Sequence, residues 1–223
     1  MHDKPLTILA LECSTSACSA AVRAPSGLLA AERVSGRGQA EAMVPLAGEV
    51  LAASGLGWEE VGLIGVTVGP GSFTGLRIGL AAARALSLAR RIPVAGVTTA
   101  DLLAFSLPKE ARRGRPFLIA IDSKRDDLFV QAFGADGAPA GEITAMLPED
   151  ALAAFSGPLA GPLLVAGDAA EQFRGLREDI EILPLLPDAA PLSELALSRW
   201  GEGRALPPQP LYLRPPDVAP PKR

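Results

Sequence analysis

The sequence of 223 residues has few of the side chains from which most active sites are built. It contains one histidine, His2, and two cysteines, Cys13 and Cys18. A single histidine excludes a histidine-based catalytic triad and a histidine-rich metal centre. The cysteines are too few for a disulfide framework, their spacing is not Cys-x-x-Cys, and neither has a histidine partner. We therefore expect two reduced and mostly buried thiols.

Aromatic residues are also scarce, and acidic residues outnumber basic ones. Aromatic residues make up 4% of the chain, so the core must consist mainly of Ala, Leu, Val and Ile. The net charge of −4 argues against a protein that grips an RNA backbone unaided, although Arg112, Arg113 and Arg115 could form a local basic patch. The apolar run Leu6–Leu11 is too short to span a membrane. We expect a cytoplasmic protein that does not bind membranes.

The first half of the chain alternates between strand and helix patterns. Apolar residues of one predicted helix recur at helical spacing, from Met43 through Leu46 to Val50. A second helix follows a glycine-rich loop and leads to another strand, which indicates a βαβ unit with a right-handed crossover. The predicted elements are strands at Thr7–Glu12, Ala17–Arg23, Leu28–Val34, Val61–Val68 and Ile92–Val97, and helices at Glu41–Ser54 and Leu76–Arg90.

The second half repeats this order of elements. Its last helix is predicted to be capped at Ser193, and Pro207–Arg223 is an extended, Pro-rich tail. The pattern predicts an α/β protein of two halves that divide near Val97–Thr99. The predicted elements are helices at Thr99–Ser106, Pro148–Phe155 and Ser193–Trp200, strands at Phe117–Asp122, Leu128–Phe133, Leu163–Gly167 and Ile180–Leu186, and a loop at Pro108–Arg115. Gly167 and Asp168 lead from the strand into the segment Ala169–Leu176, to which no element is assigned.

The loop Gly69-Pro70-Gly71-Ser72-Phe73-Thr74-Gly75 joins a predicted strand to a predicted helix. Backbone N–H groups at a helix start can bind an anion, and glycines permit close approach. The loop is not a P-loop, because Leu76 stands where that motif has lysine. A tight turn that needs small residues for packing is an equal alternative. Gly75, Gly79 and Ala83 form a small-residue ridge that packs either within the fold or across an interface.

Acidic residues at strand ends are the other candidates for a site. Glu12 and Asp122 each end a predicted strand and could hold a metal or a nucleotide. For each residue singly, a solvated loop carboxylate is the favoured interpretation. Further candidates of the same kind are Asp101, Asp126, Asp127 and Asp168.

Several stretches together resemble one family, the TsaB family of YeaZ-like proteins. The most specific is Val66–Gly79, which contains Gly-Pro-Gly-Ser-Phe-Thr-Gly-Leu-Arg-Ile-Gly. Four others are similar to the family's first strand and turn, first helix, second-lobe strand and C-terminal signature. They are Ile8–Ser19, Gln39–Leu51, Ala120–Arg125 and Pro210–Arg214.

The resemblance implies an actin-like ATPase fold of the ribonuclease H-like class, with two lobes that each hold a mixed sheet flanked by helices. On this basis we expect an N-terminal lobe at 1–98, a C-terminal lobe at 99–192, and a C-terminal helix and Pro-rich tail at 193–223.

The resemblance also implies a non-catalytic subunit that scaffolds or activates TsaD, the transferase that places threonylcarbamoyl on the tRNA adenosine next to the anticodon. Expected partners are a TsaD-like subunit, a TsaE-like ATPase and, for the chain alone, a second copy. The tRNA is expected to bind only through the complex. The family's interface helices match residues 41–54 and 75–90, and the predicted interface residues are Met43, Leu46, Val50, Gly75, Arg77, Gly79, Leu80 and Ala83.

The resemblance implies no catalytic residue, metal or required cofactor, with ATP binding left to the assembled complex. The candidates for nucleotide contact in this chain are Glu12, Ser14, Gly71 and Ser72. TsaD-like enzymes need paired histidines for their metal, which this chain cannot supply. It also has Gln39 where relatives often carry His, and Glu12 where many carry Asp. An ATP-binding kinase or ATPase of the same fold is the alternative, and a protease is remote.

Overall fold

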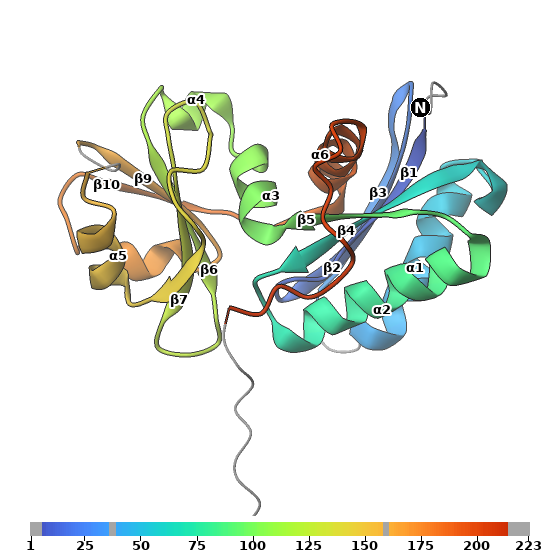
Figure 1. The fold of residues 1–223 in the computed structure, drawn as a ribbon, viewed down its shortest axis with the longest axis horizontal. Helices are drawn as coiled ribbons and strands as arrows, with labels where there is room; N and C mark the ends of the chain where they lie inside the picture. The colour runs from blue at the N-terminus through green and yellow to red at the C-terminus, as the bar shows by residue number, and fades with distance from the viewer. Residues whose placement is uncertain (1–5, 36–38, 158–160, 214–223) are drawn as a thin grey trace, which may run out of the picture.

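The computed structural model describes residues 6–35, 39–157 and 161–213, which form two five-stranded mixed sheets flanked by helices (Figure 1). The strand order is β3-β2-β1-β4-β5 in the first sheet and β10-β9-β6-β7-β8 in the second. In each sheet, three successive strands form an antiparallel meander, and two further strands add in parallel beside the first. The two sheets therefore share one topology, and the predicted two-lobed α/β fold is confirmed.

The first sheet is built around its most apolar strand. The β4 sequence Val-Gly-Leu-Ile-Gly-Val-Thr-Val-Gly is almost wholly buried, because the strand is paired on both sides and helices cover both faces of the sheet. The strands are β1 (Thr7–Glu12), β2 (Ala17–Ala24), β3 (Gly27–Ser35), β4 (Val61–Gly69) and β5 (Val94–Thr98).

The second sheet repeats this plan with shorter outer strands. Its β8 has only three residues, all of them half-buried, which is why the hydrophobic pattern did not predict it. The strands are β6 (Phe117–Asp122), β7 (Leu128–Phe133), β8 (Thr144–Met146), β9 (Leu163–Gly167) and β10 (Ile180–Pro184).

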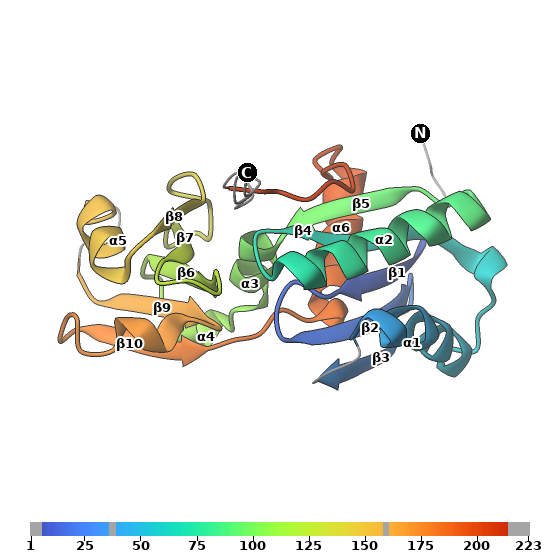
Figure 2. The same ribbon diagram turned by 90° about the horizontal axis from the view of Figure 1, so that it is seen from below.

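Helices cover both sheets, and the last one returns to the first lobe (Figure 2). The α1 and α2 helices pack on one face of the first sheet, and α6 packs on the other although it follows β10 in the chain. The α3 helix and α5 lie on opposite faces of the second sheet. The helices are α1 (Gln39–Ala53), α2 (Phe73–Arg90), α3 (Thr99–Ser106), α4 (Lys109–Arg112), α5 (Pro148–Ala154) and α6 (Ala189–Gly201), with 3-10 turns η1 (Trp58–Glu60) and η2 (Ala170–Phe173).

Three predicted boundaries were wrong for local reasons. The α2 helix begins inside the glycine loop, because the Ser72 side chain accepts the N–H of Gly75 and caps it. The loop predicted at 108–115 contains the single turn of α4. The α6 helix is capped by Asp188 rather than Ser193, which is buried and donates to the carbonyl of Ala190.

The junction between β5 and α3 falls between residues 98 and 99, and the division of the chain into lobes at that point stays a prediction. His2 and residues 214–223 of the tail lie outside the described residues. None of the helices that the described residues form is long and apolar enough to cross a lipid bilayer.

Candidate functional site

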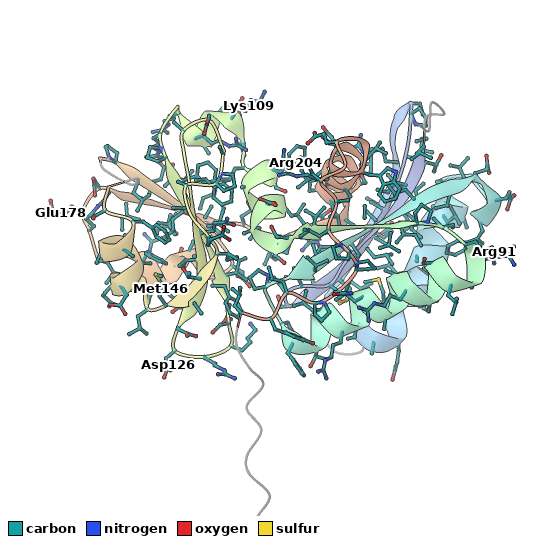
Figure 3. The ribbon with its side chains drawn as sticks, in the orientation of Figure 1. Arg91, Lys109, Asp126, Met146, Glu178 and Arg204 are labelled. Atoms are coloured by element: carbon teal, nitrogen blue, oxygen red, sulfur yellow. A yellow bond between two sulfur atoms is a disulfide. The ribbon has the colours of Figure 1, made fainter. Side chains whose placement is uncertain are left out.

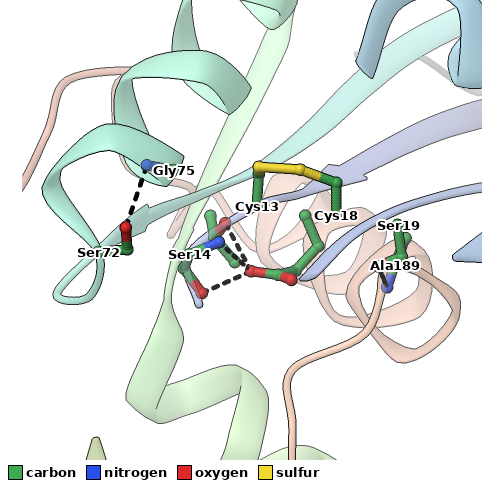
Figure 4. Close-up of a disulfide and its surroundings, with 9 residues drawn as sticks. Cys13, Ser14, Cys18, Ser19, Ser72, Gly75 and Ala189 are labelled. Atoms are coloured by element: carbon green, nitrogen blue, oxygen red, sulfur yellow. Dashed lines mark hydrogen bonds between the residues drawn. A yellow bond between two sulfur atoms is a disulfide. The ribbon is translucent and has the colours of Figure 1, made fainter. Parts of the chain in front are cut away.

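The glycine loop lies against the turn that follows β1 (Figure 4). The N–H of Ser72 donates to the carbonyl of Ser14 at 2.7 Å. A Cβ on Gly71 would lie 2.2 Å from that same carbonyl oxygen, and a Cβ on Gly75 would lie 2.1 Å from the carbonyl oxygen of Cys13. Both glycines are therefore required by close packing of two backbone segments, which supports the tight-turn interpretation of the loop.

The small-residue ridge on α2 has the same explanation. Gly75, Gly79 and Ala83 are buried, and a Cβ on Gly79 would lie 3.5 Å from the Cβ of Cys13. The ridge lets α2 approach the end of β1. Of the two alternatives left open by the sequence, packing within the fold is the one that the structure supports.

The expectation of two reduced thiols was wrong, because Cys13 and Cys18 form a disulfide. The antiparallel pairing of β1 with β2 sets Glu12 opposite Ser19, and the two cysteines follow inside that pair. Their Cα atoms are therefore only 4.3 Å apart despite a separation of five residues. Both cysteines are buried, as expected. Spacing alone could not reveal the pairing, because it depends on the register of the hairpin.

Glu12 is fully buried at the end of β1, where its carboxylate is hydrogen-bonded on one oxygen only. Its Oε1 accepts from the backbone N–H of Ser14 at 2.6 Å and from the Ser14 hydroxyl at 2.5 Å, whereas Oε2 has no partner. Burial raises the pKa of Glu12 to about 7, against the hydrogen bonds from Ser14 and Thr67 and the charge of Arg33, which lower it. Ser14 is buried as well, so both residues are enclosed rather than open to a ligand.

The raised pKa makes stability depend on pH. The folded-state pKa exceeds the ordinary value of 4.5, so the folded protein holds the Glu12 proton more tightly than the unfolded chain does. The contribution of this proton to the unfolding free energy is therefore complete below about pH 4.5 and is lost as the pH rises to about 7. The variant Glu12→Gln cannot titrate at this position, but its side-chain carbonyl can still accept hydrogen bonds from Ser14. We expect the unfolding free energy of wild type, relative to Glu12→Gln, to fall by about 3 kcal/mol between these pH values. Urea unfolding of both proteins at each pH measures this, and parallel stabilities would contradict it.

The acidic candidates of the second lobe form one close pair. The backbone N–H of Asp122 donates to Oδ1 of Asp168 at 2.9 Å. Burial alone would raise the pKa of Asp122, but hydrogen bonds from the side chain and backbone of Lys124 outweigh it and lower that pKa. Burial raises the pKa of Asp168. Across the described ranges, no group of three His, Cys, Asp or Glu side chains is arranged to hold a metal ion.

Of the other acidic and basic candidates, Asp126 is exposed and the rest have structural partners. Asp101 lies 3.8 Å from Arg199, and the Ser123 hydroxyl donates to Asp127. The predicted basic patch is largely paired within the fold, although the Arg113 side chain stays 69% exposed. Arg113 and Arg115 both pair with Glu181, and Arg112 donates to the backbone of Ala104 and lies over the Phe117 ring.

The predicted interface residues are, with one exception, part of the core. Arg77 is exposed, and Met43, although buried, also lines the groove described below. The other six are buried against β1, β2 and β4 and cannot meet a partner directly. The buried residues are Met43, Leu46, Val50, Gly75, Gly79, Leu80 and Ala83. Burial counts against six of the eight predicted contacts, because apolar periodicity marks the face of a helix that packs on its own sheet.

The outer faces of the same two helices are apolar as well. Val44 on α1 is 48% exposed, and Leu88 on α2 is 85% exposed. Between the helices runs a groove of about 540 Å³. It is lined by Ala40, Met43, Val44, Phe73, Thr74, Arg77, Ile78, Ala81, Ala82 and Ala85. We call this surface the α1–α2 face. An exposed apolar surface of this kind is typical of a protein contact site.

A second hollow, of about 580 Å³, lies between the lobes. Its walls are formed by the start of α2, the turn between β6 and β7, and the end of the C-terminal segment (residues 205–213). Of the candidate nucleotide contacts, Gly71 and Ser72 line this cleft, but Glu12 and Ser14 do not.

Comparisons with known proteins agree with this architecture. A family model described as TsaD, tRNA N6-adenosine threonylcarbamoyltransferase, matches residues 32–171. The tRNA threonylcarbamoyladenosine biosynthesis protein TsaB of Escherichia coli is 27% identical over 220 residues, which cover 94% of this chain and 95% of that protein. An uncharacterized protein of Mycobacterium tuberculosis is 31% identical over 219 residues, covering 96% and 94%. The structure of YeaZ from Pseudomonas aeruginosa is 27% identical with a TM-score of 0.72, covering 92% and 100%.

Both lobes have the same sheet topology, and α6 follows the second sheet in the chain but packs on the first. These features define a two-lobed protein of the actin-like ATPase fold. Within that fold, the chain belongs to the TsaB/YeaZ family.

Proposed function

We propose that this chain is a non-catalytic subunit in the biosynthesis of threonylcarbamoyladenosine in tRNA, and that it activates a TsaD-like transferase by pairing with it. The observation that carries the proposal is the exposed apolar α1–α2 face. The relatives in Escherichia coli and Haemophilus influenzae are named as tRNA threonylcarbamoyladenosine biosynthesis proteins, which supports the choice of pathway. Because the substrate is tRNA, the complex would work in the cytoplasm.

The scarcity of catalytic side chains supports a non-catalytic role. The chain has one histidine, and its two cysteines are joined in a disulfide. Two N–H groups of the glycine loop are used within the fold, since Ser72 donates to Ser14 and Gly75 donates to Ser72. These contacts weaken the alternative of an autonomous ATPase, which would need open loop amides for phosphate.

The contact with the partner would be made by residues that are exposed in the chain alone. Ala40 and Val44 on α1, and Ala81, Ala85 and Leu88 on α2, present small or apolar side chains to solvent. The buried residues beneath them would set the spacing of the two helices without touching the partner. In the absence of a TsaD-like subunit, a second copy of this chain would cover the same face, and a TsaE-like ATPase would join the assembled pair.

Analytical ultracentrifugation of the chain, alone and mixed with a TsaD-like subunit, tests the pairing. We expect the chain alone to form a dimer that the TsaD-like subunit replaces with a one-to-one complex. Because both contacts would use the α1–α2 face, excess TsaD-like subunit should remove the homodimer. A mixture in which the homodimer and free TsaD-like subunit sediment separately would contradict the proposal.

A further inference from the structure

The cleft between the lobes concentrates side chains that are rare elsewhere in the chain. Three of the ten aromatic residues line it, including the only tyrosine. They are Phe73, Phe129 and Tyr212. Packing in the core does not account for this concentration, because Phe73 is 49% exposed and Tyr212 is 45% exposed.

The rings of Phe73 and Tyr212 are held as a platform. Their centroids are 5.8 Å apart, and the Arg77 guanidinium carbon lies 3.7 Å from the centroid of Phe73. Nε of Arg77 also donates to the Tyr212 hydroxyl at 3.2 Å. The two ring planes are inclined by 33°, so the rings and the planar cation form one half-exposed aromatic cluster, against which a planar base can stack.

The C-terminal segment is fixed to the first sheet, which places Tyr212 in the cleft. Leu206 and Gly96 exchange two backbone hydrogen bonds, at 2.8 and 2.9 Å. The N–H of Leu211 then donates to the carbonyl of Val68 at 2.8 Å, and Nε of Arg84 donates to the carbonyl of Pro208. Tyr212 follows directly and is thus held against β4 and β5, while Phe73 belongs to the first turn of α2.

The charge of the cleft is opposite to that of the protein. The chain carries a net charge of −4, yet the described residues lining the cleft include Arg77, Lys124 and Arg125 and no carboxylate. Nζ of Lys124 pairs with Asp122 at 2.6 Å, which uses one of the three donors of the ammonium group. Asp126, on the same β6–β7 turn, lies at its outer tip (Figure 3). The lining of the cleft therefore favours an anion.

We infer that this cleft binds a nucleotide of single-stranded RNA, with the base stacked on the Phe73–Tyr212 platform and the phosphate near Lys124 and Arg125. Aromatic side chains that stack unpaired bases, beside cations for the backbone, are the general chemistry of single-strand recognition. The platform is open to solvent, which suits a nucleotide within a longer strand. The choice of RNA over a free nucleotide rests on the proposed function in tRNA modification. Direct contact of this chain with RNA departs from the expectation, based on net charge and family resemblance, that tRNA binds only through the complex, because the cleft has a local positive charge.

Fluorescence anisotropy with the full chain and a labelled RNA hairpin that has a single-stranded loop tests this inference at low salt. Phe73→Leu and Tyr212→Leu keep apolar bulk but remove the ring, and each should weaken binding about tenfold. Tyr212→Phe keeps the ring and should bind like wild type. Phe105→Leu is the matched control, because Phe105 is 40% exposed on α3 and does not line the cleft.

Charge variants make the test independent of packing at the platform. The double variant Lys124→Gln, Arg125→Gln should weaken hairpin binding about tenfold and lessen its salt dependence. Arg91→Gln removes an exposed charge at the far end of α2 (Figure 3). This variant should change neither the affinity for the hairpin nor its salt dependence.

Each other outcome would overturn the inference. The cleft is not an RNA site if the wild-type chain fails to bind the hairpin, or if the cleft variants bind it as tightly as wild type does. If duplex RNA binds as tightly as the hairpin, the binding is a general electrostatic effect and not recognition of a single strand. If ATP binds more tightly than the hairpin, the cleft is a mononucleotide pocket. Tyr212, Lys124 and Arg125 lie outside the α1–α2 face, whereas Phe73 lines both hollows. Loss of hairpin binding in the Tyr212 and charge variants with unchanged pairing to a TsaD-like subunit therefore separates failure of the inference from failure of the proposed function.

Discussion

Replacing Val44 with Asp should weaken pairing with a TsaD-like subunit at least about a hundredfold, because the interface would enclose an unpaired carboxylate. Val44 lies on the α1–α2 face and is 48% exposed, so the chain alone can solvate the new charge and should remain folded. Activation of threonylcarbamoyl transfer should fall in parallel. Isothermal titration of the two subunits measures the loss of affinity directly.

Leu147→Asp is the matched control for this variant. Leu147 is 44% exposed in the second lobe, at the N-cap position of α5, where Asp is a favoured residue. It should leave both fold and pairing unchanged. If Val44→Asp pairs as tightly as Leu147→Asp, the contact must lie elsewhere on the molecule.

Replacing Gly71 with Ala should destabilise the fold by about 3 kcal/mol or more. The new Cβ would lie 2.2 Å from the carbonyl oxygen of Ser14, and backbone on both sides of this contact cannot turn away as a side chain can. The N–H of Ser72 donates to the same oxygen, so any shift also costs that hydrogen bond. Urea unfolding at a fixed pH measures the change in unfolding free energy.

Gly48→Ala is the control for the glycine variant. Gly48 lies within α1, and a Cβ there would meet no atom within 4 Å. Alanine at such a helix position should stabilise the protein by about 0.5–1 kcal/mol. Opposite signs for the two variants are expected. A Gly71→Ala protein as stable as wild type would show that the loop does not need its close approach to the β1 turn.

The elements that could be predicted from sequence are those whose pattern is local. The apolar run of β4 and the glycine loop after it indicated a buried strand leading into a helix, and both are present. The start of α6 was missed because Ser193 and Asp188 are both good capping residues, and only the packing of α6 on the first sheet decides between them. The resemblance to a family supplied the fold of the whole chain, which no local pattern contains.

The features of the site that were missed depend on the pairing of distant segments. Cys13 and Cys18 meet because of the β1–β2 register, and the periodicity of Met43, Leu46 and Val50 identified a core face where an interface was expected. The aromatic cleft joins Phe73, Phe129 and Tyr212 from three separate parts of the chain. Its only sequence signal was the scarcity of aromatic residues, which makes their meeting in one place informative.

The most direct test of the account is transfer of threonylcarbamoyl to tRNA by the purified chain alone, by its TsaD-like partner alone, and by both together. We predict no transfer by this chain alone and at least about tenfold more transfer by the pair than by the partner alone. The pair that contains Val44→Asp should match the partner alone. Transfer by this chain in the absence of the partner, or full activity of the partner without this chain, would contradict a non-catalytic activating role.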